Sequence, residues 1–262
     1  MTDWEKESRT FDAVAADYDA YRPDYPEALI ETIISETGVT PSGKILEIGS
    51  GTGKATLLFA RRGFSIVCVE PGENLVAVAA RKLKEDRVEF EIARFEEWRE
   101  RANEFDLAMS AQAFHWIPKE IGYAKAARAL KSDGHLALFW NRYPALDSDI
   151  ARDLDRVYKE RAPDLSTPLD SSIEELIRRV ETAINESSAF DSVRVRTFPW
   201  SARYDTTQYL GLLNTYSDHL ILAPQIRQHL FDGVAQVIAR HGGSIERPYI
   251  AVLFVAQKRK AG

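Results

Sequence analysis

The chain has 262 residues, a formal net charge of −6 and one cysteine, Cys68. This length can bury a sizeable core, which we interpret as a single elaborated domain over 1–262, and one thiol excludes an internal disulfide. The acidic balance argues against sequence-independent binding to nucleic acid, which needs a basic face. Because the sequence shows neither a leader-like segment nor an apolar run of about 20 residues, we expect a cytoplasmic protein without a membrane partner.

The first half of the chain alternates between strand-like and helix-like patterns. Short runs of apolar residues predict strands over 44–48, 65–69, 88–92, 105–109 and 135–140. Apolar residues at steps of three and four predict helices over 54–62, 73–84 and 119–130, with breaks at Gly63, Gly72 and the turn 132–134. This alternation is typical of an α/β fold whose parallel sheet is covered on both faces.

After Trp140 the strict alternation stops. Helices are predicted over 147–162, 171–187 and 206–241, and strands over 193–200 and 249–256. We interpret 30–145, completed by strands near 190–200 and 247–258, as a cofactor-binding core. The remaining segments, 1–29, 146–188 and 201–246, are predicted to form a lid.

The most informative segment is Lys44-Ile-Leu-Glu-Ile-Gly-Ser-Gly-Thr-Gly-Lys54. Glycine permits a positive φ and a close approach of a ligand, and the helix that follows would direct its free N–H groups at the site. A dinucleotide fingerprint would need glycine at Lys54, and a P-loop would need glycine at Ile48. Glu47 would also repel a pyrophosphate, whereas it could hold a cationic amino group directly or through water.

Glu70 ends the next predicted strand, roughly twenty residues after the central glycine, where strand-helix-strand nucleoside sites bind ribose. A carboxylate at this position can accept hydrogen bonds from both ribose hydroxyls, whereas it would reject a 2′-phosphate. Glu47, the glycines Gly49, Gly51 and Gly53, and Glu70 therefore suit a nucleoside with an amino-acid tail. S-adenosylmethionine is such a molecule.

These features resemble the class I S-adenosylmethionine-dependent methyltransferases, and specifically the small-molecule branch related to trans-aconitate methyltransferases. The resemblance covers about the first 145 residues and rests on Glu47-Ile-Gly-Ser-Gly-Thr-Gly53, Glu70-Pro71, Phe11-Asp-Ala-Val-Ala-Ala-Asp-Tyr18 with Tyr21-Arg-Pro-Asp-Tyr-Pro26, and Ser110-Ala-Gln-Ala-Phe-His-Trp116. It implies a Rossmann-like, seven-stranded, mostly parallel sheet whose last strand is antiparallel.

The resemblance implies further cofactor contacts. Tyr21 and Arg22 would fold over the methionine end, with Arg22 pairing with a carboxylate of the cofactor or the acceptor. Phe95 and Glu96 would contact adenine, although Arg94-Phe95 replaces the usual Asp-Ala pair, and Pro71 and Ala111 would adjoin the site. Each role has a structural alternative. Arg22 could be a surface arginine beside Pro23, and Glu96 could be the first-turn acid of a helix over 96–101.

His115 is the candidate catalytic residue, because it follows the fourth strand at the carboxyl edge, where ligands bind in open α/β sheets. It would position the acceptor or, for a hydroxyl acceptor, take its proton; the alternative is that it packs in a loop and orients Trp116. Residues expected to line the acceptor pocket, each with a purely structural alternative, are Phe114, Trp116, Arg142, Tyr143 and Tyr216. His135, His229 and His241 lack acid or cysteine partners at metal-ligand spacing, so no metal is expected.

The predicted function is transfer of a methyl group from S-adenosylmethionine to a small-molecule acceptor, with a carboxylate or another oxygen favoured over nitrogen or carbon. The alternative is a regulatory protein that binds S-adenosylmethionine without turnover. An NAD(P)-dependent oxidoreductase is disfavoured by Lys54, which stands where the dinucleotide fingerprint needs glycine.

Overall fold

The structure is a computed structural model that describes residues 12, 14–84, 87–144, 148–165 and 172–260. Phe11 and Ala13 of the entry segment, and Pro168 between two predicted helices, lie outside the described residues. The chain divides into two compact units. The core unit comprises Asp24–Arg142, Ser171–Phe198 and Ile250–Gly262, and the helical unit comprises Met1–Pro23, Tyr143–Asp170 and Pro199–Tyr249.

This division differs from the predicted boundaries between core and lid. Residues 24–29 and 171–188, which were predicted as lid, belong to the core unit. The helix over 173–186 belongs there because its buried residues Leu176, Val180 and Ile184 join the hydrophobic cluster of the sheet. The lid role expected for the helical unit stays a prediction.

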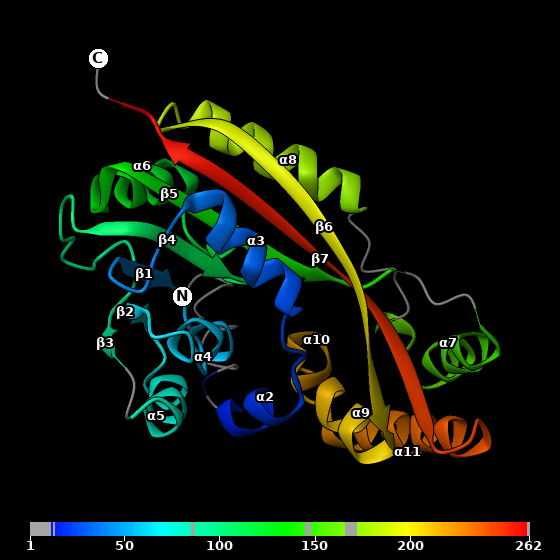
Figure 1. The fold of residues 1–262 in the computed structure, drawn as a ribbon. Coiled ribbons are helices and arrows are strands. Elements are labelled where there is room, and N and C mark those ends of the chain that lie inside the picture. The colour runs from blue at the N-terminus through cyan, green and yellow to red at the C-terminus, as the bar shows by residue number, and fades with distance from the viewer. Residues whose placement is uncertain (1–11, 13, 85–86, 145–147, 166–171, 261–262) are drawn as a thin grey trace. The chain divides into compact units, whose positions relative to one another are not determined.

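A seven-stranded sheet organises the core unit, with the strand order β3-β2-β1-β4-β5-β7-β6 (Figure 1). The strands are β1 (Lys44–Ile48), β2 (Ser65–Glu70), β3 (Val88–Ile92), β4 (Phe105–Ala111), β5 (Leu130–Arg142), β6 (Phe190–Asp205) and β7 (Ser244–Lys258). The first five strands pair in parallel, and β7 pairs antiparallel with β5, from His135↔Gln257 to Arg142↔Ile250. The predicted mostly parallel sheet with its antiparallel last strand is confirmed.

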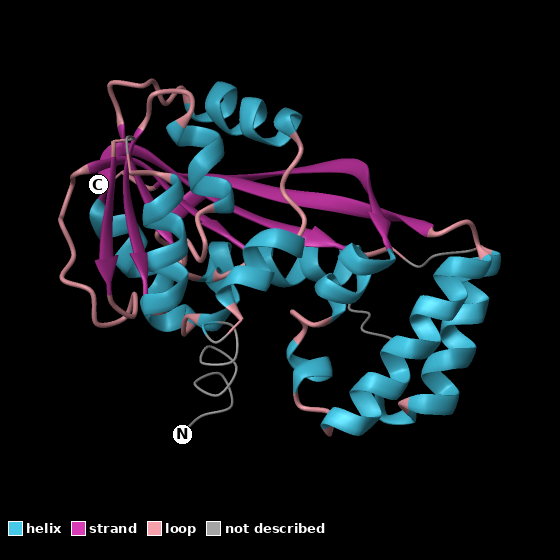
Figure 2. Cartoon of the chain, turned by 90° about the horizontal axis from the view of Figure 1, so that it is seen from below, coloured by secondary structure: helices cyan, strands magenta, loops and turns pink. Residues whose placement is uncertain are grey.

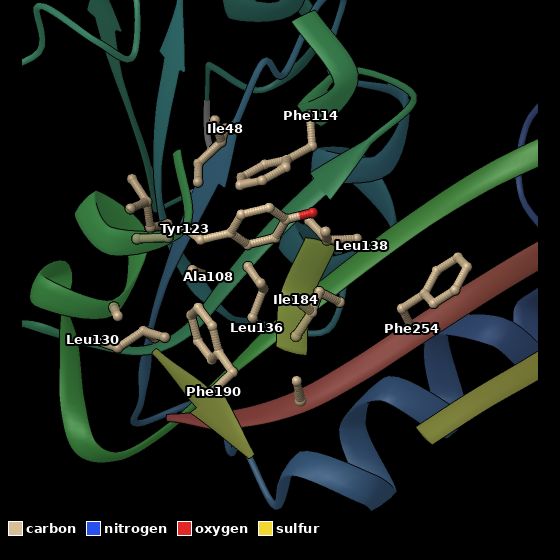
Figure 3. Packing of buried hydrophobic residues seen from close by; sticks show 14 of the residues in the cluster. Ile48, Ala108, Phe114, Tyr123, Leu130, Leu136, Leu138, Ile184, Phe190 and Phe254 are labelled. Carbon is tan, nitrogen blue, oxygen red and sulfur yellow. The ribbon is translucent and has the colours of Figure 1, made fainter. Parts of the chain in front are cut away.

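Among the described residues, the helices of the core unit that flank this sheet are α3 (Glu27–Thr37), α4 (Lys54–Ala60), α5 (Glu73–Lys82), the short 3-10 helix η1 (Phe114–Trp116), α6 (Lys119–Ala129) and α8 (Ile173–Glu186). Helix α8 begins after Ser172, whose hydroxyl accepts a hydrogen bond from the backbone of Glu175. Figure 3 shows the rings of Phe114 and Tyr123 packed together beside Ile48. The centroids of the two rings are 4.9 Å apart. This packing fixes η1 next to the end of β1, where the glycine loop begins.

The helical unit contains α2 (Ala15–Tyr21), α7 (Asp149–Arg161), the 3-10 turn η2 (Pro163–Leu165), α9 (Thr206–Leu213), α10 (Ser217–Leu220) and α11 (Pro224–Arg240). Helices α7 and α11 lie side by side (Figures 1 and 2). The single helix predicted over 206–241 is three helices, because the backbone turns at Asn214–Tyr216 and restarts at Pro224, which is favourable at the first position of a helix. Asp205 starts α9 through a capping box with Gln208.

Two local predictions are corrected by the structure. Residues 96–101, predicted as a helix, form a turn that ends by Trp98. Trp98 stays buried and donates a hydrogen bond to Glu91 at 2.8 Å, so tertiary contacts hold the segment without helical structure. The turn predicted at 132–134 is a bulge within β5, since Phe105 pairs with Leu130 while Leu107 pairs with His135. Over the described ranges, none of the helices has the length and hydropathy of a bilayer span.

Candidate active site

The glycine loop joins β1 to α4 with three residues in the left-handed region. Gly49, Gly51 and Gly53 have φ of 71°, 55° and 78°. A Cβ on Gly49 would stand 2.4 Å from the Cβ of Ala113, and one on Gly53 would touch Ala79 and Leu83 at 3.1 Å. A Cβ on Gly51 would meet nothing within 4 Å. Gly49 and Gly53 therefore serve packing, whereas Gly51 presents its backbone to open space, as a close ligand contact requires.

Glu47 lies fully buried under this loop, in the middle of the sheet. Its Oε2 accepts a hydrogen bond of 2.6 Å from the Thr56 hydroxyl, while Oε1 has no partner among the described residues. Burial, reinforced by the negative charge of Glu70 and opposed by the Thr56 hydrogen bond, raises the pKa of Glu47 to about 8. The sequence suggested an ionised carboxylate facing a cationic group, but without a ligand this side chain is mainly a neutral acid at pH 7.

Glu70, at the carboxyl end of β2, is buried beside the same loop. Its two oxygens accept hydrogen bonds of 2.9 Å from the backbone amides of Gly51 and Gly72. The carboxylate thus fixes the middle of the glycine loop and keeps lone pairs that can accept further hydrogen bonds. Pro71, the next residue, is exposed.

Polar atoms of the loop fit a polar ligand. The hydroxyls of Ser50 and Thr52 are buried and, like Glu47 Oε1, lack a hydrogen-bond partner in the described structure. Buried polar groups without partners are rare, so these atoms together with the open approach at Gly51 are consistent with a nucleoside that carries an amino-acid group.

The second half of the entry segment is held beside the loop by the core unit itself. Asp24 accepts a hydrogen bond of 2.9 Å from Lys54, the first residue of α4, and its backbone carbonyl accepts another of 2.9 Å from Asn141. Tyr25 packs edge-on against Phe139 of β5, with ring centroids 4.9 Å apart. The segment therefore passes over the carboxyl ends of β1 and β5.

Phe95 and Glu96, the predicted adenine contacts, follow β3. The Phe95 side chain is buried and stacks on Trp98, so only its backbone is left for a ligand. Glu96 is paired with Arg94 at 3.1 Å, and its backbone carbonyl accepts a hydrogen bond from Lys125. Ala111 is the last residue of β4, and the next residue, Gln112, has a φ of 61°, which is uncommon outside glycine. Sequence reasoning did not single out this Gln112 turn.

His115 lies on η1, with its ring between two indoles. Ring centroids are 4.6 Å from Trp116 and 6.4 Å from Trp140, and Nδ1 accepts a hydrogen bond of 3.2 Å from Trp140 Nε1. An indole N–H can only donate, so Nδ1 of the neutral ring is the acceptor and Nε2 carries the proton. His115 as a whole is exposed at the surface, but desolvation of its imidazole beside these indoles, together with the positive charges of Arg179 and Arg142, lowers its pKa to about 4.

The two arginines that influence His115 come from different elements of the core unit. Arg142 ends β5, as the sequence indicated, whereas Arg179 lies on α8. Sequence reasoning missed Arg179, because α8 was assigned to the lid and nothing local connects it with η1. The carboxyl end of the sheet therefore carries a neutral N–H donor and two cationic side chains.

Four predicted site residues lie in the helical unit or at its boundary. Tyr21 packs against Gly211 of α9, where a Cβ would come within 2.4 Å of its ring. Arg22 donates a hydrogen bond of 2.8 Å to the carbonyl of Thr215. Tyr143 and Tyr216 meet edge to face, with ring centroids 6.1 Å apart. Their contacts with cofactor and acceptor stay predictions, as do those of the core-unit residues.

Comparisons with known proteins agree with this site. Residues 45–134 match a family model described as a methyltransferase domain. This range contains the glycine loop, Glu70 and His115. The match and the geometry of the site together support an S-adenosylmethionine-dependent methyltransferase.

Relatives and solved structures extend the similarity. An uncharacterized methyltransferase of Schizosaccharomyces pombe is 33% identical over 134 residues, which are 51% of this chain and 53% of that protein. One from Mycobacterium tuberculosis is 27% identical over 94% of both chains. The structure of a putative type II methyltransferase from Anaeromyxobacter dehalogenans has a TM-score of 0.62 at 21% identity and covers 92% of this chain and 98% of that one.

S-adenosylmethionine is the cofactor that these comparisons support. A phosphoethanolamine N-methyltransferase of Haemonchus contortus, solved in complex with S-adenosyl-L-methionine, shares the fold with a TM-score of 0.56 at 16% identity, and covers 95% of this chain and 57% of that one. The contacts predicted between the adenosyl part and the residues Gly51 and Glu70 stay predictions. No group of three or more side chains suited to a metal occurs among the described residues.

Proposed function

We propose that this methyltransferase acts on a small anionic acceptor and transfers the methyl group to a carboxylate oxygen, like the trans-aconitate methyltransferase branch that its sequence resembles. The observation that carries the proposal is the set of donors at the carboxyl end of the sheet. His115 has its proton on Nε2, and Arg142 and Arg179 are close enough to lower its pKa. Two cations and a neutral donor favour an anion over an amine.

The chemistry of a carboxylate acceptor matches these side chains. When bound, S-adenosylmethionine would supply an electrophilic methyl group on a sulfonium and would leave as the neutral thioether S-adenosylhomocysteine. A carboxylate acceptor has no proton to lose, so no base would be required. Arg142 and Arg179 would attract and orient the carboxylate, and the Nε2–H of His115 would donate a hydrogen bond to it. The indoles of Trp116 and Trp140 keep the histidine ring in place.

The same geometry argues against His115 as a general base. With Nδ1 occupied by Trp140 Nε1–H, the ring presents a donor and not an acceptor. Its pKa of about 4 also makes the neutral ring a weak base at pH 7. A positioning role follows from both observations.

The proposal is tested by methyl transfer from labelled S-adenosylmethionine, with the purified full chain, to a panel of carboxylates, alcohols and amines. We expect labelled product with carboxylates, and this product should release volatile label in mild alkali because methyl esters hydrolyse there. Alkali-stable label on an amine or an alcohol would contradict the carboxylate assignment. Cofactor binding without transfer to any acceptor class would favour the regulatory alternative.

Replacement of His115 tests its role as a donor. We expect His115→Phe to lower kcat/KM about tenfold, the effect of one hydrogen bond to a charged group, and His115→Gln to retain more activity because its amide still donates. Because the folded pKa of about 4 lies below the usual 6.5, the ring stays neutral from pH 8 down to about 5. The pH profiles of wild type and variants should therefore be parallel over this range, whereas an acidic limb near pH 6 to 7 that vanishes in His115→Gln would indicate a base.

A further inference from the structure

Among the described residues of the helical unit, two partly buried arginines have aromatic partners and no carboxylate within ion-pair distance. The guanidinium of Arg22 lies over the rings of Tyr216 and Tyr18, at 4.4 and 5.2 Å from the centroids. The guanidinium of Arg247 lies over Tyr143 at 5.0 Å and donates a hydrogen bond of 3.0 Å to the hydroxyl of Tyr209. Within the described ranges, neither arginine forms an ion pair with a carboxylate.

These groups converge around Tyr216. Its hydroxyl, the Nε of Arg22 and the Nε of Arg247 are all buried and, within the part of the chain that the structure describes, lack hydrogen-bond partners. Burial raises the pKa of Tyr216 well above its usual value, while Arg247 and Arg22 act to lower it, as expected for two cations near its hydroxyl. Tyr143 contacts the Tyr216 ring edge to face.

The acidic side chain that interacts electrostatically with Arg22 already accepts hydrogen bonds from another residue. Asp218 accepts hydrogen bonds from the backbone N and from Nδ1 of His219, at 2.8 and 2.7 Å. His219 is in turn hydrogen-bonded to Tyr158 at 2.8 Å. Asp218 is therefore part of a separate Asp-His-Tyr network, although its carboxylate also interacts electrostatically with Arg22.

Two partly buried guanidinium groups, each with a buried Nε donor that lacks a partner among the described residues, are costly unless an anion neutralises them. We propose that Arg22, Arg247, Tyr143 and Tyr216 form an anion site in the helical unit that binds the carboxylate of a small molecule. The planar guanidinium matches a carboxylate, which can accept from both Nε–H groups and from the Tyr216 hydroxyl. This inference deepens the proposed function, since it rests on a carboxylate-bearing acceptor, and it adds Arg247 as a residue that recognises it.

The carboxylate can come from two sources with the same chemistry, the acceptor or the methionine end of the cofactor. The test measures the thermal stability of the full chain without cofactor in succinate, citrate and inorganic phosphate, each against chloride at equal ionic strength. We expect a saturable rise in Tm with a carboxylate, about 4 °C at tenfold its Kd. Absence of a rise with either carboxylate, or a rise with phosphate alone, would overturn the proposal.

Substitutions test which residues form the proposed anion site. Arg22→Gln and Arg247→Gln should weaken carboxylate binding at least about tenfold. Their Tm without ligand should change little, because each substitution removes a partly buried charge without a carboxylate partner among the described residues, together with one hydrogen bond and its ring contacts. Tyr216→Phe, which keeps the ring, covers the case in which an arginine variant fails to fold and should also weaken binding. Arg240→Gln removes an exposed charge from the same unit and should behave like wild type. Equal carboxylate binding in all these variants would overturn the proposal.

Calorimetry with S-adenosylhomocysteine separates the two sources. Unchanged affinity in Arg247→Gln, with lost carboxylate binding, identifies the carboxylate of the acceptor. A parallel loss of affinity identifies the carboxylate of the cofactor. If carboxylates bind this site but no carboxylate is methylated, the site stands and the proposed function fails.

Discussion

Gly51→Ala is expected to weaken the binding of S-adenosylmethionine strongly while leaving the protein folded. Gly51 has a φ of 55°, and an added Cβ would meet no protein atom within 4 Å, so the substitution leaves the packing intact. The methyl group would instead occupy the space through which the ligand approaches the loop. We expect a loss of affinity of at least about thirtyfold, or 2 kcal/mol, measured by calorimetry with S-adenosylhomocysteine.

Gly38→Ala is the matched control for this variant. Gly38 ends α3 with a φ of 66° and also has nothing within 4 Å of an added Cβ. Both alanine variants should therefore lose about 1 to 2 kcal/mol of stability, the cost of a left-handed alanine. Only Gly51→Ala should lose the cofactor. Equal affinity in the two variants would show that the loop does not contact the ligand.

Glu47→Gln is expected to stabilise the cofactor-free protein at pH 8 and to change little below pH 5. The pKa of Glu47 is about 8 in the folded state against 4.5 for the exposed side chain, chiefly because of burial. The folded state therefore holds a proton that the unfolded state releases between these values, so wild-type stability falls as pH rises from about 4.5 to 8. Glutamine does not titrate, and the variant should gain roughly 2 to 4 kcal/mol at pH 8.

Urea unfolding at pH 5, 6.5 and 8 measures this effect as the difference between variant and wild type. Glu97→Gln supplies the control, because Glu97 is an exposed carboxylate of the same unit, with 72% of its side chain accessible. Its difference from wild type should stay near zero at each pH. A pH-independent difference for Glu47→Gln would mean that the buried carboxylate keeps an ordinary pKa.

Local sequence patterns were sufficient to predict those features whose residues all lie within one segment of the chain. The glycine loop needs only the strand 44–48, three alternating glycines and the start of a helix, and these are neighbours along the chain. Parallel strands could be assigned for the same reason, since a continuous apolar run is buried on both faces. The turn at 96–98 was misassigned because Trp98 is fixed by Glu91 of β3, and such contacts override helix propensity.

The amino-acid sequence by itself determined the parallel sheet, the position of the glycine loop and the acids Glu47 and Glu70 at its edge, because each depends on residues close in the chain. Only the tertiary structure decided their chemistry. Burial under the loop makes Glu47 a neutral acid, and Trp140 places the proton of His115 on Nε2. It also brought Arg179 near His115 and Arg247 near Tyr216, since electrostatic and hydrogen-bonding environments are set by neighbours in space.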